Sequence, residues 1–142
     1  MLRTLLCLSI AVLACAADWT VGWKSASEQA AKANKPILAD FTGSDWCGWC
    51  IKLKKEVFNT PEFAAWAKDN VILLEVDFPR TSALPKAQQV ENQAMADKYK
   101  IEGFPTILLL SATGKVLGRL GYEAGGPSVW IPSAQKLIPT RK

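Results

Sequence analysis

The sequence predicts an α/β fold in which helices flank a central mixed sheet and the chain closes with a β-hairpin and a helix. Short apolar runs typical of buried strands alternate with stretches typical of helices, which indicates parallel core strands covered on both faces. The composition agrees, because 142 residues with 49% hydrophobic and 21% charged side chains suit one packed domain.

Residues 1–16 predict a secretory leader that precedes the fold. A basic start leads into the apolar run 4–13, and Ala14-Cys15-Ala16 has the small-x-small pattern of a cleavage site. We therefore expect a signal peptide over 1–16, a single mature domain over 17–142, and a secreted or periplasmic protein. An uncleaved membrane anchor and lipidation of Cys15, which ends a lipobox-like sequence, are the alternatives.

The first half of the mature chain predicts three helices and two strands. Ser25-Ala26-Ser27-Glu28 has a capping-box pattern, and Thr60-Pro61-Glu62 combines a hydroxyl cap, a first-turn proline and an acid. The predicted elements are a helix from 25 to about 34 with Ala26, Ala30 and Ala33 inward, a buried strand 37–41, a helix from 47 to about 57, a helix from 60 carrying Phe63, Trp66 and Ala67, and a strand 71–76.

The second half predicts one more helix, a hairpin and a terminal helix, with proline and glycine marking the breaks. The predicted elements are a polar loop 78–85, a helix 86–100 with Val90, Ala94 and Met95 inward, a buried strand 107–110, a turn 111–114, an edge strand 115–120, a helix from about 127 bent at Pro132, and a tail 140–142.

Cys47 and Cys50 are the only cysteines left once the leader is removed. A bridge between them closes so short a loop that it stabilises the fold little, which favours a chemical role. Thiol–disulfide exchange needs an attacking thiolate and a second thiol within reach. A helix N-terminus lowers the pKa of the Cys47 thiol, and one helical turn brings Cys50 close. We therefore assign Cys47 as nucleophile and Cys50 as resolving thiol.

The composition excludes several other kinds of site. The chain has no histidine, so it cannot build a Ser-His-Asp triad, a Cys-His pair or a His-ligated metal site. A net charge of +4 from scattered residues does not favour nucleic-acid binding. Half of a zinc site and an inert disulfide remain as alternatives for Cys47 and Cys50. We expect no metal and no cofactor.

Asp40 stands inside an otherwise apolar strand. Burial of an ionised carboxyl is costly, so we expect its pKa to be raised. Such a group can accept and return the proton of the resolving cysteine. The alternative is a solvated carboxyl at the end of the strand.

Five further residues are candidates for binding substrate. Trp46 and Trp49 flank the cysteines and can offer an apolar platform to an unfolded chain, with core packing as the alternative for Trp46. Phe104-Pro105-Thr106 leads into a strand, and a cis bond before Pro105 would present a backbone edge to an extended substrate. A trans turn is the alternative there.

These motifs together resemble thioredoxin. Asp40-Phe41, Trp46-Cys47-Gly48-Trp49-Cys50 and Gly103-Phe104-Pro105-Thr106 follow the family's order and rough spacing over residues 30–122, in a form similar to exported relatives of protein disulfide isomerases. The resemblance implies a thioredoxin fold, a cis-proline at Pro105 opposite the cysteines, and Asp40 as the buried acid behind Cys50. Leu73 replaces the lysine usual near that acid, which implies a lost charge partner, and loop 78–85 is longer than usual.

The resemblance also implies a protein-disulfide oxidoreductase, acting as a reductase or an isomerase in the periplasm. Its partners would be proteins with cysteines or disulfides and a membrane-bound electron donor, and we expect a monomer. A chaperone or adaptor with a static disulfide is the alternative. Trp49 replaces the usual proline between the cysteines, so the motif does not predict the direction of electron flow.

Overall fold

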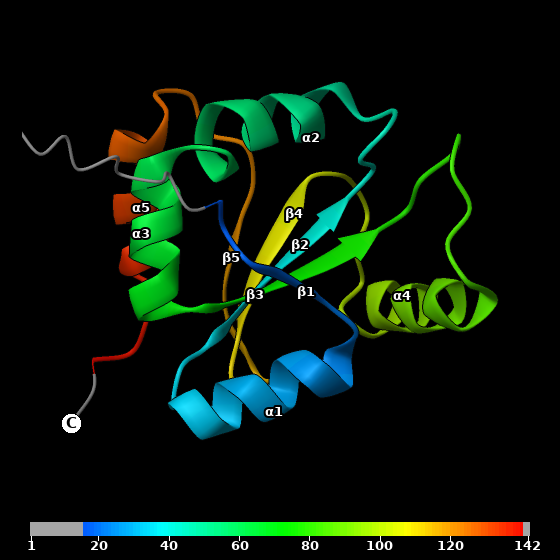
Figure 1. Ribbon diagram of the computed structural model, residues 1–142, viewed down its shortest axis with the longest axis horizontal. Coiled ribbons are helices and arrows are strands. Elements are labelled where there is room, and N and C mark those ends of the chain that lie inside the picture. The colour runs from blue at the N-terminus through cyan, green and yellow to red at the C-terminus, as the bar shows by residue number, and fades with distance from the viewer. Residues whose placement is uncertain (1–15, 141–142) are drawn as a thin grey trace, which may run out of the picture.

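The computed structural model describes residues 16–140, which form a mixed sheet between two groups of helices (Figure 1). The strands lie in the order β1-β3-β2-β4-β5. The elements are β1 Trp19–Val21, α1 Trp23–Ala33, β2 Ile37–Thr42, α2 Gly48–Leu53, the π-helical turn η1 Lys54–Phe58, α3 Pro61–Asn70, β3 Ile72–Asp77, α4 Lys86–Lys98, β4 Thr106–Leu110, β5 Val116–Leu120 and α5 Pro127–Gln135.

The predicted mixed sheet with its terminal hairpin and helix is confirmed, but its core is parallel only in part. Strands β1 and β2 run parallel to β3, whereas β4 is antiparallel to both β2 and β5. Thr106, the first residue of β4, pairs with Phe41 near the end of β2. The chain therefore returns through α4 to the end of the sheet at which β2 and β3 finish, so β4 runs in the opposite direction to them.

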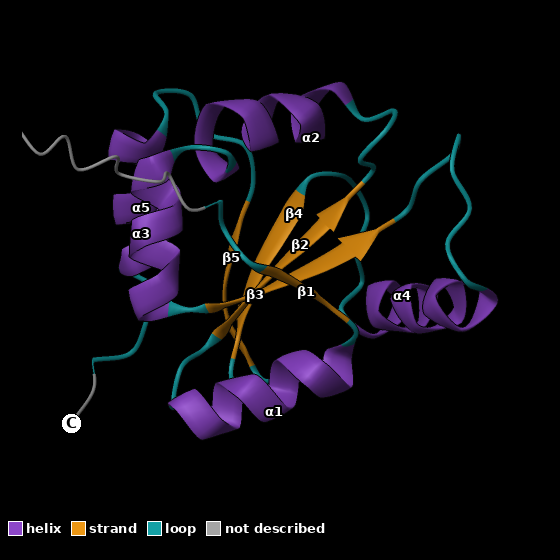
Figure 2. Cartoon of the chain, viewed as in Figure 1, coloured by secondary structure: helices purple, strands orange, loops and turns teal. Residues whose placement is uncertain are grey.

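Two hydrophobic clusters fix the helices to the sheet. Helices α1 and α4 cover one face, and α2, α3 and α5 cover the other (Figure 2). On the second face the rings of Phe58, Phe63 and Trp130 contact one another, with centroids 4.8 to 5.9 Å apart. This aromatic cluster joins η1, α3 and α5.

The N-terminal segment differs from its prediction. Strand β1 was not predicted, because three residues are too few to show a period. Helix α1 begins at Trp23, so the capping box at Ser25 is wrong. Gly22 lies at the N-cap with φ 93°, and the Trp23 N–H donates to the Glu91 carboxylate of α4. Ala26 and Ala30 are buried as expected, whereas Ala33, the last residue of α1, is exposed.

Helix α4 presents a different face to the core than its apolar residues predict. Val90 and Ala94 are exposed, whereas Met95 is buried as expected. Asn92 is also buried, and its side-chain amide donates to the Asp77 carbonyl at 2.8 Å. That hydrogen bond turns a polar residue inward and the two apolar ones outward.

The remaining elements match their predictions closely. The Thr60 hydroxyl caps α3 by accepting the Phe63 N–H at 3.3 Å. The helix predicted from Cys47 is divided into α2 and η1. Of the predicted leader and tail, residues 1–15 and 141–142 lie outside the described part of the chain. Within residues 16–140 no helix is long and apolar enough to cross a membrane.

Candidate functional site

Cys47 and Cys50 form a disulfide at the start of α2, with their Cα atoms 5.2 Å apart. Cys47 occupies the N-cap, and its sulfur accepts the Cys50 backbone N–H at 3.2 Å. Both residues are buried, Cys47 at 7% exposure and Cys50 at 4%. An N–H donor and a helix N-terminus directed at the Cys47 sulfur stabilise negative charge there when the pair is reduced.

Trp46 is fixed beside the disulfide by contacts on several sides. Gly43 lies so close to the indole that a Cβ at this position would overlap the ring. The indole Nε1 donates to the Phe78 carbonyl at 2.8 Å, and the Arg80 guanidinium lies 3.6 Å from the ring centroid. Phe104 meets the ring edge-on at a centroid distance of 5.9 Å. These contacts leave Trp46 half-buried, with part of its ring accessible beside the disulfide.

Loop 78–85 is bound to the segment that leads into the cysteines. The Asp45 carboxylate accepts backbone N–H groups of Arg80, Thr81 and Ser82, and also the Thr81 hydroxyl. These hydrogen bonds lower the pKa of Asp45 to about 2. This connection has no sequence signal, because Asp45 and its partners lie 35 to 37 residues apart.

The Phe104–Pro105 peptide bond is cis. Because Thr106 pairs with Phe41, the turn lies at the end of the sheet from which the chain leaves towards the cysteines. The Thr106 hydroxyl donates to the Gly103 carbonyl at 2.7 Å. Phe104 and Pro105 are half-exposed and Thr106 is buried, so the first two form the accessible part of the turn.

A second aromatic pair flanks the disulfide. Trp49 is 57% exposed, and its ring lies 4.9 Å from that of Tyr122. The Lys52 amine lies 5.3 Å from both ring centroids. The Tyr122 hydroxyl donates to Glu56 at 2.7 Å, which raises the pKa of Tyr122. Tyr122 was not predicted as a site residue, since nothing in the sequence links it to Trp49.

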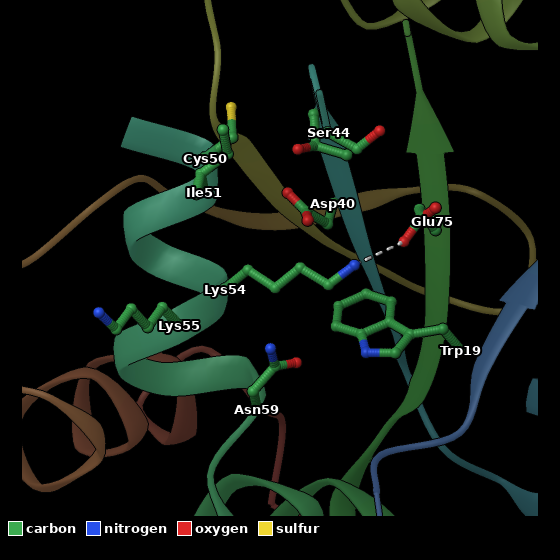
Figure 3. A pocket seen from close by; sticks show the side chains of 10 residues that line it. Trp19, Asp40, Ser44, Cys50, Ile51, Lys54, Lys55, Asn59 and Glu75 are labelled. Atoms are coloured by element: carbon green, nitrogen blue, oxygen red, sulfur yellow. Dashed lines mark ion pairs between the residues drawn. The ribbon is translucent and has the colours of Figure 1, made fainter. Parts of the chain in front are cut away.

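Asp40 lies behind the disulfide, on the wall of a cavity of about 170 Å³ that Cys50 also lines (Figure 3). The carboxyl is 8% exposed, and its Oδ1 has no hydrogen-bond partner among the described residues. Burial raises the pKa of Asp40 to about 8, and the neighbouring carboxylate of Glu75 adds to the effect. Asp40 is thus inside the protein rather than solvated at the strand end.

A lysine does lie near Asp40, contrary to the expectation drawn from Leu73. Leu73 is buried in the hydrophobic cluster beneath α2. The cation comes instead from Lys54, whose amine is 3.9 Å from the Glu75 carboxylate and opposes the rise in the pKa of Asp40. Two signals could have found these residues: Lys54 is one helical turn beyond Cys50, and Glu75 is an acid in an apolar strand.

No metal centre is indicated in the described part of the chain, where His, Cys, Asp and Glu nowhere gather in threes with a geometry that could hold an ion.

Comparison with known proteins gives consistent results. Residues 23–125 match the family described as "Thioredoxin-like domain". The disulfide bond reductase DsbH of Chlamydia pneumoniae is 37% identical over 122 residues, covering 84% of this chain and 74% of DsbH. The thioredoxin-related protein DsbJ of the same organism is 31% identical, but the match covers only 30% of its length. A solved structure of a DsbH oxidoreductase superposes with a TM-score of 0.85 at 33% identity, covering 95% of this chain and 93% of that one.

Proposed function

Because this chain belongs to the thioredoxin-like family and is a thiol–disulfide oxidoreductase, we propose that it reduces disulfide bonds of protein substrates with Cys47 and Cys50 as its working pair. The observation that carries this proposal is the Cys47–Cys50 disulfide at the N-terminus of α2, with a backbone N–H on the Cys47 sulfur. The direction of electron flow is supported by the similarity to a protein named as a disulfide bond reductase.

Cys47 is the attacking residue in this proposal. In the reduced protein the Cys50 N–H and the helix N-terminus favour the Cys47 thiolate. The thiolate attacks one sulfur of a substrate disulfide, a Cys47–substrate disulfide forms, and the other substrate sulfur leaves as a thiolate that takes a proton from water.

Cys50 completes the reaction. Its thiol gives a proton to the Asp40 carboxylate, and the resulting thiolate attacks the Cys47 sulfur. The Cys47–Cys50 disulfide forms and the second substrate thiolate leaves, so two electrons have passed from the protein to the substrate. An external dithiol must then reduce the pair again.

The substrate would lie on the surface formed by Trp46, Trp49, Phe104 and Pro105. Thr106, which is buried, would hold this turn from inside through its hydrogen bond to the Gly103 carbonyl. Backbone groups next to the cis-proline can pair with an extended chain, as an added strand does. The exposed ring of Trp49 and the half-buried ring of Trp46 give apolar contact on either side of the sulfurs.

We place this activity outside the cytoplasm, with residues 1–16 as a cleaved leader and 17–142 as the mature domain. A membrane-bound dithiol donor and a monomeric state are part of this proposal. N-terminal sequencing of the exported protein tests the cleavage site.

The decisive experiment is to trap the mixed disulfide. Cys50→Ser should accumulate covalent adducts with oxidised insulin or cellular proteins through Cys47, whereas the matched Cys47→Ser variant should not. The wild-type protein should also accelerate insulin reduction by dithiothreitol. No adduct and no acceleration would indicate a static disulfide in an adaptor or chaperone instead.

A further inference from the structure

Two carboxyl groups lie side by side behind the disulfide. Asp40 on β2 and Glu75 on β3 are register partners in a parallel pair, so their side chains project from the same face of the sheet. Figure 3 shows both carboxyl groups directed towards the cavity that Cys50 lines. The site therefore contains a second acid for which the proposed reaction has so far given no role.

Three charged residues around this cavity differ in their exposure to solvent. The Asp40 residue is 8% exposed, while the side chains of Glu75 and Lys54 are 28% and 50% exposed. The Lys54 amine reaches in from η1 and pairs with Glu75 at 3.9 Å (Figure 3). The Lys54–Glu75 pair thus lies between the buried carboxyl and water.

We propose that Glu75 and Lys54 form a charge pair at the mouth of this cavity that sets the proton affinity of Asp40 in opposite directions, and so sets the pH at which Cys50 reacts. The inference rests on the proposed function, because it assigns these two residues a positioning role in the Cys50 step. Both residues act on the reaction through Asp40.

Three charged groups act on Asp40. The Glu75 carboxylate favours protonated Asp40, and the Lys54 ammonium favours its ionised form. Asp77, also on β3, acts in the same direction as Glu75, but it accepts two hydrogen bonds from Ser44. Strand β4 presents only apolar Ile107 opposite Asp40. Glu75 and Lys54 are therefore the neighbouring charges that are free to set the proton affinity.

The proton step links these charges to the chemistry. The Cys50 thiol passes its proton to ionised Asp40, the Cys50 thiolate attacks Cys47, and the bond between Cys47 and the substrate breaks. Asp40 then loses the proton to water at the cavity mouth. Since only ionised Asp40 can accept the proton, the rate of this step should rise with pH across the titration of that carboxyl.

The first test is direct titration of Asp40 in the oxidised protein by carboxyl-carbon NMR, with Asp40→Asn identifying its resonance. Glu75→Gln should lower the Asp40 pKa and Lys54→Met should raise it, each by about 0.5 unit or more. The matched controls Glu62→Gln and Lys55→Met change the net charge of the protein by the same amounts. They should leave the Asp40 pKa unchanged. Lys55 also lines the cavity, but its amine points away from Asp40 (Figure 3).

The second test is the pH profile of single-turnover oxidation of the reduced protein by a peptide disulfide. Its midpoint should move to lower pH in Glu75→Gln, to higher pH in Lys54→Met, and back towards wild type in the double variant. The inference would be overturned if the Asp40 pKa were the same in all variants, or if Glu75→Gln and Lys54→Met shifted it in the same direction. It would also be overturned if the pH midpoint of the oxidation rate did not move in these variants. If the reduced wild-type protein did not react with the peptide disulfide at all, the proposed function would be refuted. The NMR titration of Asp40 would still test the effect of the charge pair.

Discussion

The guanidinium of Arg80 lies over the indole of Trp46, with its central carbon 3.6 Å from the ring centroid. This contact joins loop 78–85 to the residue that precedes the nucleophile. Asp45 holds the loop in place through the backbone N–H groups of residues 80–82. Loop 78–85 and the segment that leads into Cys47 are therefore held together on both sides of Trp46.

Asp45→Ala should release the loop and weaken the packing on Trp46. We expect a lower midpoint of thermal unfolding and faster proteolytic cleavage within 78–85, with Glu102→Ala as an exposed control. Since hydrogen bonds hold the pKa of Asp45 near 2 against an ordinary value of 3.8, this stabilisation should be complete above pH 3.8 and lost as the pH falls towards 2. Equal cleavage rates in the variant and the control would contradict this role.

Gly43→Ala should displace Trp46, because the added Cβ would overlap the indole. We expect a loss of about 1–3 kcal/mol in the free energy of unfolding and a changed near-ultraviolet circular dichroism signal. Gly48→Ala is the matched control, since its Cβ would meet nothing within 4 Å. If both variants unfolded at the same denaturant concentration, the close packing of Gly43 on Trp46 would not matter.

Asp40→Asn should stabilise the protein increasingly as the pH rises. Below pH 3.8 the carboxyl is protonated in both states; between 3.8 and about 8 it ionises only in the unfolded chain, so stability falls with rising pH. Relative to wild type, the free energy of unfolding of the variant should gain roughly 5 kcal/mol between pH 4 and pH 8, since each pKa unit is worth about 1.4 kcal/mol. Denaturant titrations at several pH values measure it, and a difference that is independent of pH would argue against a buried neutral carboxyl.

Trp49→Ala should impair substrate binding without harming the fold. The ring is 57% exposed, so the free energy of unfolding should change by no more than about 0.5 kcal/mol. The KM for a peptide disulfide should rise roughly threefold or more, whereas reduction of the protein by dithiothreitol should keep its rate. An unchanged KM would remove Trp49 from the proposed binding surface.

The sequence predicts the central strands well because their signal is local. The runs 37–41 and 71–76 are almost wholly apolar, and the structure places β2 and β3 there. The cysteine pair and its helix follow from spacing alone. Strand β1 does not, since its three residues are defined by pairing with β3 rather than by any pattern of their own.

The features that the sequence does not predict depend on contacts between distant segments. The face of α4 is set by the hydrogen bond from Asn92 to the Asp77 carbonyl, which outweighs the apolar character of Val90. The start of α1 is set by Glu91, which is 68 residues from Trp23. The charge pair of Lys54 and Glu75 likewise needs η1 to lie against β3, which no single segment encodes.

The reduction potential of the Cys47–Cys50 pair tests the central claim most directly. It can be measured by equilibrating the protein with dithiothreitol redox buffers and counting free thiols. A protein-disulfide reductase should have a potential close to that of thioredoxin, about −270 mV. A value near about −120 mV, typical of a strong oxidant, would contradict the proposal that electrons flow from this pair to substrate disulfides.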